Sequence, residues 1–185
     1  MERNIEIKAR LGNIAVVYSR VSTFADSGPI VVMQDDTFFA CKNGRLKLRT
    51  LSPTEGELIF YRRDDKSGPK ESFYLISPIT TPDIVRKSLS LAYGQVGRVV
   101  KTRTLFLVGR TRIHLDRVKG LGNFLELEVV LFEREHQETG EEIAKDLMKR
   151  LGVIPNQLIK GAYIDLLRKK LTKKRISTIE FKATQ

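Results

Sequence analysis

The sequence predicts a protein of the α+β class, in which eight strands form one closed or nearly closed antiparallel sheet with helices around it. Three observations carry this prediction. Eight segments alternate polar and apolar residues with a period of two, which is typical of strands. Four further segments have helical periodicity or helix caps, and several neighbouring strands are joined by turns short enough for antiparallel pairing. Strands and helices that are segregated in this way favour α+β over a parallel α/β fold.

The eight expected strands are residues 2–10, 31–41, 45–50, 57–64, 72–77, 96–108, 111–118 and 123–133. Turn-forming residues mark three loops, at Ser27-Gly28-Pro29, at residues 64–70 and at residues 120–123. The glycines of the last loop lack the spacing of a dinucleotide-binding motif, so that loop is interpreted as a hairpin turn.

The four expected helices begin with recognisable signals. Residues 13–21 carry an apolar stripe, and a second helix starts at Thr81-Pro82 and ends at Gly94. A capping box at Thr139 and Glu142 starts the third, which ends at Gly152. The fourth begins near Pro155.

Length and charge indicate one folded domain with a basic end. The chain has 185 residues and a net charge of +11. Residues 160–185 carry eight basic residues against two acidic ones. We therefore expect a domain over residues 1–168 and a basic C-terminal tail over residues 169–185, which is either solvated or in contact with nucleic acid or an acidic partner.

The composition excludes several classes of protein. No apolar run has the roughly 18 residues that a membrane span needs, and no signal region follows Met1. A single cysteine, Cys41, excludes an internal disulfide and is more typical of a small core residue than of a nucleophile. Two histidines argue against a His-rich zinc site. A cytoplasmic protein that does not enter the membrane is expected.

Charged residues recur on one face of the strands, because successive side chains of a strand point to opposite sides. One face gathers basic residues at Lys8, Arg10, Arg45, Lys47, Arg49, Arg63, Lys101, Arg103 and Arg112. The same face gathers acidic residues at Glu6, Asp116, Glu126 and Glu128. The opposite, apolar faces need helices to cover them, so the charged faces point either to water or into one shared interior.

The mixture of signs favours a shared interior, since buried charges are costly unless they are paired or bound to an ion. An excess of cations suits a polyphosphate, and a group of carboxylates suits a divalent metal that arrives with it.

These residues resemble the CYTH superfamily, also called triphosphate tunnel metalloenzymes, which includes class IV adenylate cyclase-like and thiamine triphosphatase-like proteins. The family's opening Glu-x-Glu-x-Lys is matched by residues 4–8, with Asn4 in place of the first Glu. Further matches follow in order over residues 2–168; they are residues 34–39, 44–49, 58–63, 101–103, 112–116, 122–128 and 163–167.

The resemblance implies an eight-stranded antiparallel closed β-barrel, the triphosphate tunnel, with Mg²⁺ or Mn²⁺ as cofactor. It places the metal at Asn4, Glu6, Asp116, Glu126 and Glu128, where Asn4 offers an oxygen but no charge. It places triphosphate contacts at Lys8, Arg45, Lys47, Arg49, Arg63, Lys101, Arg103, Arg112 and Lys160. Catalytic roles fall to Lys8, Arg63, Arg112 and His114, the last as an aid to proton transfer or as a neighbour that orients an acid.

Three functions remain open from the sequence. A metal-ordered water attacking the terminal phosphorus gives a hydrolase of ATP, thiamine triphosphate or tripolyphosphate. Attack by the ribose 3′-hydroxyl of ATP gives an adenylate cyclase that releases pyrophosphate. A non-catalytic barrel that binds polyphosphate or nucleic acid is the third, but carboxylates among the cations weaken the case for nucleic acid. Hydrolysis is favoured because water needs no nucleoside pocket. The sequence leaves open whether the protein is a monomer or a homodimer.

Overall fold

Eight strands and four α-helices make up the protein, of which the computed structural model describes the backbone of residues 2–183 and the side chains of residues 3–173. The strands are β1 (Glu2–Leu11), β2 (Ser27–Phe39), β3 (Arg45–Ser52), β4 (Glu55–Arg63), β5 (Lys70–Ile79), β6 (Gln95–Val108), β7 (Thr111–Val118) and β8 (Gly122–Val130). The helices are α1 (Ile14–Ser22), α2 (Pro82–Tyr93), α3 (Gln137–Leu151) and α4 (Tyr163–Ala183), with a short 3₁₀ turn at Pro155–Gln157.

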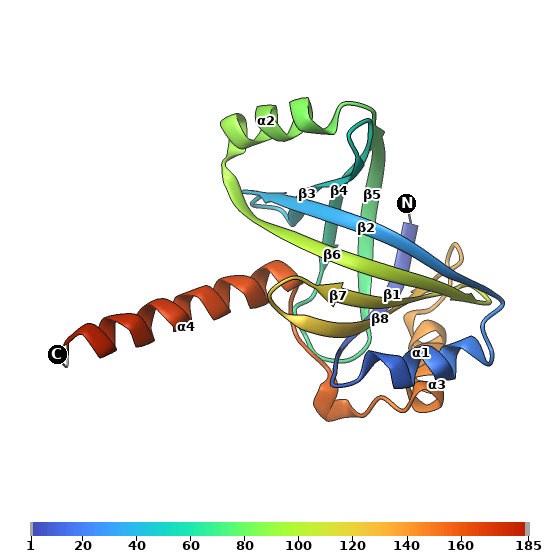
Figure 1. Ribbon diagram of the computed structural model, residues 1–185. Helices are drawn as coiled ribbons and strands as arrows, with labels where there is room; N and C mark the ends of the chain where they lie inside the picture. Colours follow the sequence, from blue (N-terminus) through green and yellow to red (C-terminus); the bar gives the residue numbers. More distant parts are fainter. Residues whose placement is uncertain (1, 184–185) are drawn as a thin grey trace.

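The strands pair in a closed ring, in the order β1-β5-β4-β3-β2-β6-β7-β8, and every pair is antiparallel. Figure 1 shows the strands enclosing a common interior. The predicted antiparallel sheet of the α+β class is thus confirmed as a ring of eight strands with four helices around it. In this order β1 and β2 lie on opposite sides of the ring.

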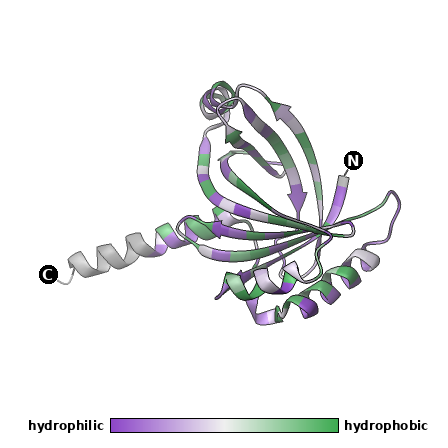
Figure 2. Ribbon diagram, turned by 45° about the vertical axis from the view of Figure 1, so that its right-hand side comes forward, coloured by the Kyte–Doolittle hydropathy of each residue, from purple (hydrophilic) through white to green (hydrophobic). Residues whose placement is uncertain are grey.

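The main apolar core lies outside the ring, between its strands and the helices α1 and α3 (Figure 1). Ile5 and Ile7 of β1 and Leu127 of β8 are fully buried there, together with Leu147 and Leu151 of α3. This burial follows from the sequence of the strands, along which hydrophilic and hydrophobic residues alternate (Figure 2). One set of side chains faces these helices, which leaves the alternate, polar set to face the interior.

A second apolar cluster fixes the start of α4 against the ring. Tyr163 and Ile164 pack with Phe38 of β2, Val99 of β6 and Phe124 of β8. This packing brings the first turn of α4 to the interior, and the hydroxyl of Tyr163 enters the site described below.

Four predictions made from the sequence are wrong in detail. Ser27-Gly28-Pro29 is the start of β2 and not a loop, because a register shift between Ser27 and Ile30 absorbs these residues into the strand. The third helix begins at Gln137, before the expected capping box. Pro155 starts only the 3₁₀ turn, and α4 begins after Gly161, whose φ of 76° lies in the left-handed region that favours glycine. Cys41 is exposed and is no core residue.

The predicted loop at 64–70 is confirmed over residues 64–69, whereas Lys70 is already the first residue of β5. The hairpin turn between β7 and β8 is confirmed as well, and the Leu121 amide closes it by donating to the Val118 carbonyl at 3.0 Å. Within the described residues, no helix has the combination of length and apolar character that a membrane crossing requires. The expected basic tail begins within α4, and the side chains of residues 174–185 lie outside the described part of the chain.

Candidate active site

The interior of the ring holds a cavity of about 370 Å³, called the central cavity below, whose size falls within the range of small-molecule sites. Seven basic side chains line it: Lys8, Lys47, Arg49, Arg63, Lys101, Arg103 and Arg112. Five acidic side chains line it as well: Glu6, Asp36, Glu57, Glu126 and Glu128. The wall therefore has a surplus of two positive charges over its own carboxylates.

Twelve of the fifteen site residues predicted from the sequence line the central cavity, since the inward faces follow the strand alternation. They are Asn4, Glu6, Lys8, Lys47, Arg49, Arg63, Lys101, Arg103, Arg112, His114, Glu126 and Glu128.

The other three predicted residues lie elsewhere. Arg45 lines a separate hollow and pairs with Asp65 and Asp165, at 2.7 and 2.9 Å. Lys160 is exposed, beside the loop that precedes α4. Asp116 is fully buried behind the cavity wall, where it accepts hydrogen bonds and does not face the cavity.

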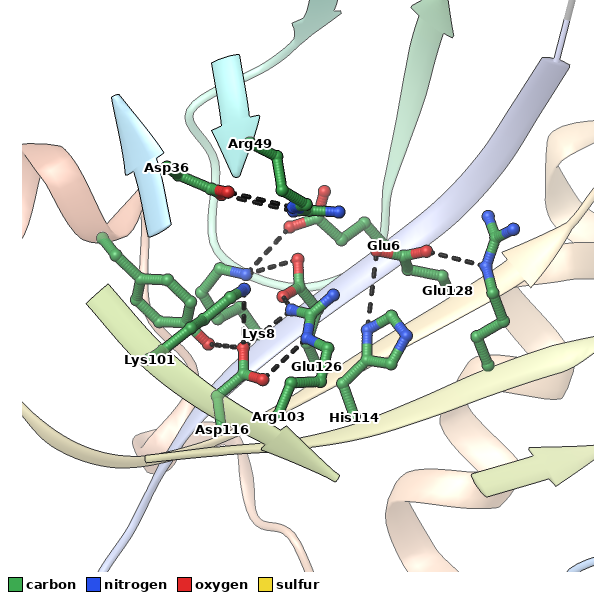
Figure 3. Close-up of polar contacts among 12 residues, drawn as sticks. Glu6, Lys8, Asp36, Arg49, Lys101, Arg103, His114, Asp116, Glu126 and Glu128 are labelled. Atoms are coloured by element: carbon green, nitrogen blue, oxygen red, sulfur yellow. Dashed lines mark hydrogen bonds and ion pairs between the residues drawn. The ribbon is translucent and has the colours of Figure 1, made fainter. Parts of the chain in front are cut away.

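Arg103 is the centre of the buried charge network in Figure 3. Its Nε and Nη2 each donate to one oxygen of Asp116 at 2.7 Å, and Nη2 also donates to Glu126 Oε2 at 2.6 Å. Lys101 Nζ and the Tyr163 hydroxyl complete the partners of Asp116, at 3.1 and 3.0 Å. Burial would raise the pKa of Asp116, but Arg103 and Lys101 outweigh it and hold that pKa below its ordinary range.

A second group of buried charges consists of Asp36 on β2 and two cations, Lys47 and Arg49, on β3. Asp36 accepts from Lys47 Nζ at 2.7 Å and from Arg49 Nε at 2.9 Å. Burial opposes ionisation of Asp36, yet the charges of Arg49 and Lys47 lower its pKa well below its ordinary value. Asp36 thus holds two cations side by side at the surface of the cavity.

β1 contributes alternating charges along the same interior. Lys8 Nζ lies 3.3 Å from Glu6 Oε1 and 2.5 Å from Glu126 Oε1, above the ring of Tyr163. Arg63 pairs with Glu6 through Nη1 and donates through Nη2 to the Gly161 carbonyl at 2.8 Å. Burial raises the pKa of Glu126, but Lys8 and Arg103 lower it further than burial raises it.

Among the described residues, one group of His and Glu side chains can hold a metal ion. His114 of β7 and Glu126 and Glu128 of β8 each offer a ligand atom, and these atoms lie within 4.8 Å of one another. Asn4 lines the same cavity from β1, two residues before Glu6, which pairs with Glu128. Within the described part of the chain, its buried Oδ1 has no hydrogen-bond partner, and neither has the buried Nδ1 of His114. Carboxylates together with unpartnered buried acceptors are a donor set that fits a divalent cation.

Two of the cavity bases lose basicity. Burial, with a further contribution from Arg103, lowers the pKa of His114 to about 3, although Glu128 opposes this. The imidazole is therefore neutral at pH 7. Burial and the neighbouring charge of Arg103 lower the pKa of Lys101 to about 7. Both shifts follow mainly from burial, which disfavours the charged form of each base.

Two residues of the cavity wall, Asp36 and Tyr163, and one buried residue that does not line the cavity, Lys70, were not predicted from the sequence. Asp36 shares the inward parity of β2, Tyr163 stands in the last matched motif, and Lys70 sits where a loop was expected. Lys70 is fully buried, and its Nζ donates to the Lys66 carbonyl at 3.1 Å. An inward parity count on β2 would have found Asp36.

Comparison with known proteins agrees with this arrangement. Residues 2–163 match the family model described as the CYTH domain. A curated protein of Aeromonas hydrophila, named adenylate cyclase CyaB, is 26% identical over 180 residues, which make up 91% of this chain and 90% of that protein.

Solved structures show the same fold. A protein from Pyrococcus horikoshii OT3 superposes with a TM-score of 0.77 at 24% identity, covering 88% of this chain and 98% of its own. A Hippeastrum protein, described as an adenylyl cyclase candidate with a dominant triphosphatase activity, gives a TM-score of 0.65 at 16% identity and covers 92% of this chain and 96% of its own.

Proposed function

Because this chain belongs to the CYTH family, we propose that it is a divalent-metal-dependent enzyme that hydrolyses a triphosphate bound in the central cavity. The observation that carries the proposal is the composition of one enclosed wall, in which seven cations and five carboxylates face the same 370 Å³. ATP, thiamine triphosphate and tripolyphosphate share the group that such a wall recognises.

Charge balance supports a metal partner. A terminal triphosphate carries about four negative charges near neutral pH, since its last ionisation has a pKa of about 6. The seven cations of the wall are largely matched by its carboxylates and by Asp116, so the wall alone does not neutralise a triphosphate and a divalent cation would supply the missing positive charge. Glu6, Glu126 and Glu128, with Asn4 beside them, are the residues proposed to hold it.

The metal would supply Lewis-acid polarisation of phosphoryl oxygens and activation of a water. The chain's own side chains do the rest. Arg49, Arg103 and Lys101 bind phosphate oxygens through charge-assisted hydrogen bonds, and Asp36 and Asp116 hold these cations in place before substrate arrives. Phosphoryl transfer requires positioning more than covalent chemistry, so no nucleophilic side chain is needed.

Lys8 and Arg63 line the central cavity next to the carboxylates that are proposed to hold the metal. Each is tied to Glu6 in the structure, and Lys8 also to Glu126. A phosphate oxygen offers both cations a new acceptor, which would release carboxylate oxygens toward the metal. Arg112 holds Glu128 through Nε at 2.9 Å and also donates to the Tyr74 hydroxyl at 2.9 Å, so it orients one carboxylate of the group.

Cyclisation of ATP is the second candidate, favoured by the Aeromonas relative named adenylate cyclase over 91% of this chain. Hydrolysis is preferred because it needs only water as nucleophile, whereas cyclisation needs a ribose held against the α-phosphorus. A non-catalytic polyphosphate or nucleic-acid binder is the third candidate, and the five carboxylates of the wall count against it.

Product analysis tests the proposal. The protein is incubated with ATP, thiamine triphosphate and tripolyphosphate, each with Mg²⁺ or Mn²⁺ and each with a chelator. Orthophosphate and the corresponding diphosphate are expected, only with metal. Cyclic AMP with pyrophosphate as the main product from ATP would instead establish the cyclase, and binding without any product would leave the non-catalytic candidate.

A further inference from the structure

The neutral imidazole of His114 lies against the proposed metal position, and its ring has an unusual environment. The residue is 4% exposed, and its buried Nδ1 has no hydrogen-bond partner among the residues that the structure describes. The nearest carboxylate oxygen, Glu128 Oε1, lies 3.7 Å away, too far for a hydrogen bond. A buried ring nitrogen of a folded protein is ordinarily paired, so this atom lacks the partner that its position requires.

Strand pairing brings His114 to this place. His114 lies directly opposite Glu126 in the β7–β8 ladder, and Glu128 lies directly opposite Glu6 in the β8–β1 ladder. All three side chains point inward, and Figure 3 shows the imidazole and the Glu128 carboxylate facing each other across the same space. The ring is therefore fixed by backbone register.

A single ion fits the spacing of these groups. Bonds from a metal to imidazole nitrogen or carboxylate oxygen are about 2.0–2.2 Å long, so ligand atoms on opposite sides of an ion stand about 4.2 Å apart. The ligand atoms of His114, Glu126 and Glu128 lie within 4.8 Å of one another, so small side-chain movements bring them together on one ion.

The oxygens of the two glutamates are not equally free. Glu128 Oε2 is held by Arg112, which leaves Oε1 directed at His114. Both oxygens of Glu126 are paired, Oε1 with Lys8 and Oε2 with Arg103. Among the described residues, His114 Nδ1 and Asn4 Oδ1 are thus buried atoms that can bind a metal and have no hydrogen-bond partner. Glu128 Oε1 lies 3.7 Å from the imidazole nitrogen.

We propose that His114 is a nitrogen ligand of the divalent metal, in addition to the carboxylates and the Asn4 amide proposed above, and that this nitrogen makes the site prefer transition ions to Mg²⁺. The inference rests on the proposed metal dependence and adds the ligand and the selectivity. Imidazole binds first-row transition ions well, and affinity rises from Mn²⁺ to Co²⁺. Mg²⁺ prefers oxygen ligands and gives up its water reluctantly.

The decisive experiment reads the nitrogen directly and needs no turnover. Untagged protein is loaded with Mn²⁺ alone, and pulsed electron paramagnetic resonance detects modulation from a ¹⁴N nucleus bound to the ion. The chain has two histidines, so His136, which is exposed, gives a matched control. Modulation is expected in the native protein and in His136→Gln, and its loss is expected in His114→Gln.

Labelling keeps the test independent of how well the variant folds. Native protein with ¹⁵N-histidine should show the ¹⁵N frequency in place of the ¹⁴N one. Bound Mn²⁺ without any nitrogen coupling would overturn the proposal, and so would coupling that disappears in His136→Gln and persists in His114→Gln.

Calorimetric titrations of the metal-free protein measure the selectivity. His114→Gln should lose at least tenfold in affinity for Co²⁺ and Mn²⁺, and less than threefold for Mg²⁺. An equal loss for all three ions would show that His114 acts only on the shape of the site and would refute the nitrogen ligand. Absence of phosphate release from every triphosphate would defeat the proposed function, and the nitrogen coupling would still be measured.

Discussion

Arg103 and Asp116 form a side-on ion pair behind the wall of the central cavity, in which Nε and Nη2 of Arg103 each donate to one oxygen of the fully buried Asp116 at 2.7 Å. The sequence predicts Asp116 near the metal, whereas its contacts lead us to propose a positioning role. Lys101 and the Tyr163 hydroxyl share its oxygens with Arg103, so the carboxylate serves to fix two cations and one aromatic ring. It aims cations at the cavity and does not itself face it.

Asp116→Asn should therefore cost stability and polyanion binding far more than metal binding. Removing one partner of a buried ion pair costs about 3–5 kcal/mol, because an uncompensated charge stays behind. Urea unfolding measures this loss, and calorimetry should find Mn²⁺ affinity within threefold of the native value. Asp35→Asn breaks the pair with the half-exposed Arg98 and should cost less than about 1 kcal/mol. A large selective loss of Mn²⁺ affinity in Asp116→Asn would return Asp116 to the metal ligands.

Neighbouring arginines on β4 provide a test of the inward face. Arg63 lines the central cavity, whereas Arg62 is exposed on the opposite face. Arg63→Ala should weaken tripolyphosphate binding about 10- to 150-fold, since charge-assisted hydrogen bonds contribute about 1.5–3 kcal/mol. Arg62→Ala should leave it unchanged. Equal losses in calorimetric titrations would mean that charge alone attracts the ligand, with no bound position in the cavity.

Strand alternation explains why so much of the site could be predicted. Glu6 and Lys8 pair directly with Glu128 and Glu126 in the β1–β8 ladder, so all four side chains point to the same side of the sheet. Pairing of β7 with β8 adds His114 to that side, which is the interior of the ring. The same reasoning could not predict that other side chains separate Asp116 from the cavity. Strand alternation tells which side of the sheet a residue faces, but not whether its neighbours cover it.

Features that depend on tertiary contacts could not be predicted from the sequence. Arg45 has the inward parity of β3, but it lies near the strand end, where Asp65 and Asp165 draw it to another hollow. Lys70 follows a glycine- and proline-containing loop, and only the β1–β5 pairing opposite Glu6 makes it a buried strand residue. The register shift that admits Ser27-Gly28-Pro29 to β2 depends on β6 and has no local signal.

Lys70 should make stability depend on alkaline pH. Burial, aided by Arg63 and Lys8, lowers its pKa from 10.5 to about 8, and it pairs with no carboxylate among the described residues. Between pH 8 and 10.5 the unfolded chain binds the proton that the folded chain has lost, so stability rises with pH across this window. Lys70→Met should raise the free energy of unfolding at pH 7 by up to about 3 kcal/mol, and the gain should vanish near pH 10.5. Denaturant unfolding at both pH values measures it; Lys66→Met, in the exposed loop, should show neither effect, and a gain independent of pH would contradict the assignment.

The last prediction concerns the amide where the family pattern has a glutamate. Asn4 and Gln34 are both buried, both line the central cavity and both have an unpartnered side-chain oxygen, but they lie on strands at opposite sides of the ring. Asn4→Asp and Gln34→Glu therefore add the same charge to the same cavity, near the His114–Glu128 group in the first case and beside Asp36 in the second. Asn4→Asp should raise Mg²⁺ affinity about tenfold or more, because a hard cation gains a charged oxygen ligand. Gln34→Glu should change Mg²⁺ affinity less than threefold, since the new carboxylate lies opposite Lys101 in the β2–β6 ladder. Calorimetric titration of the metal-free proteins decides between them: equal gains would mean that the metal responds to the total charge of the cavity, and no gain in Asn4→Asp would place the ion away from β1.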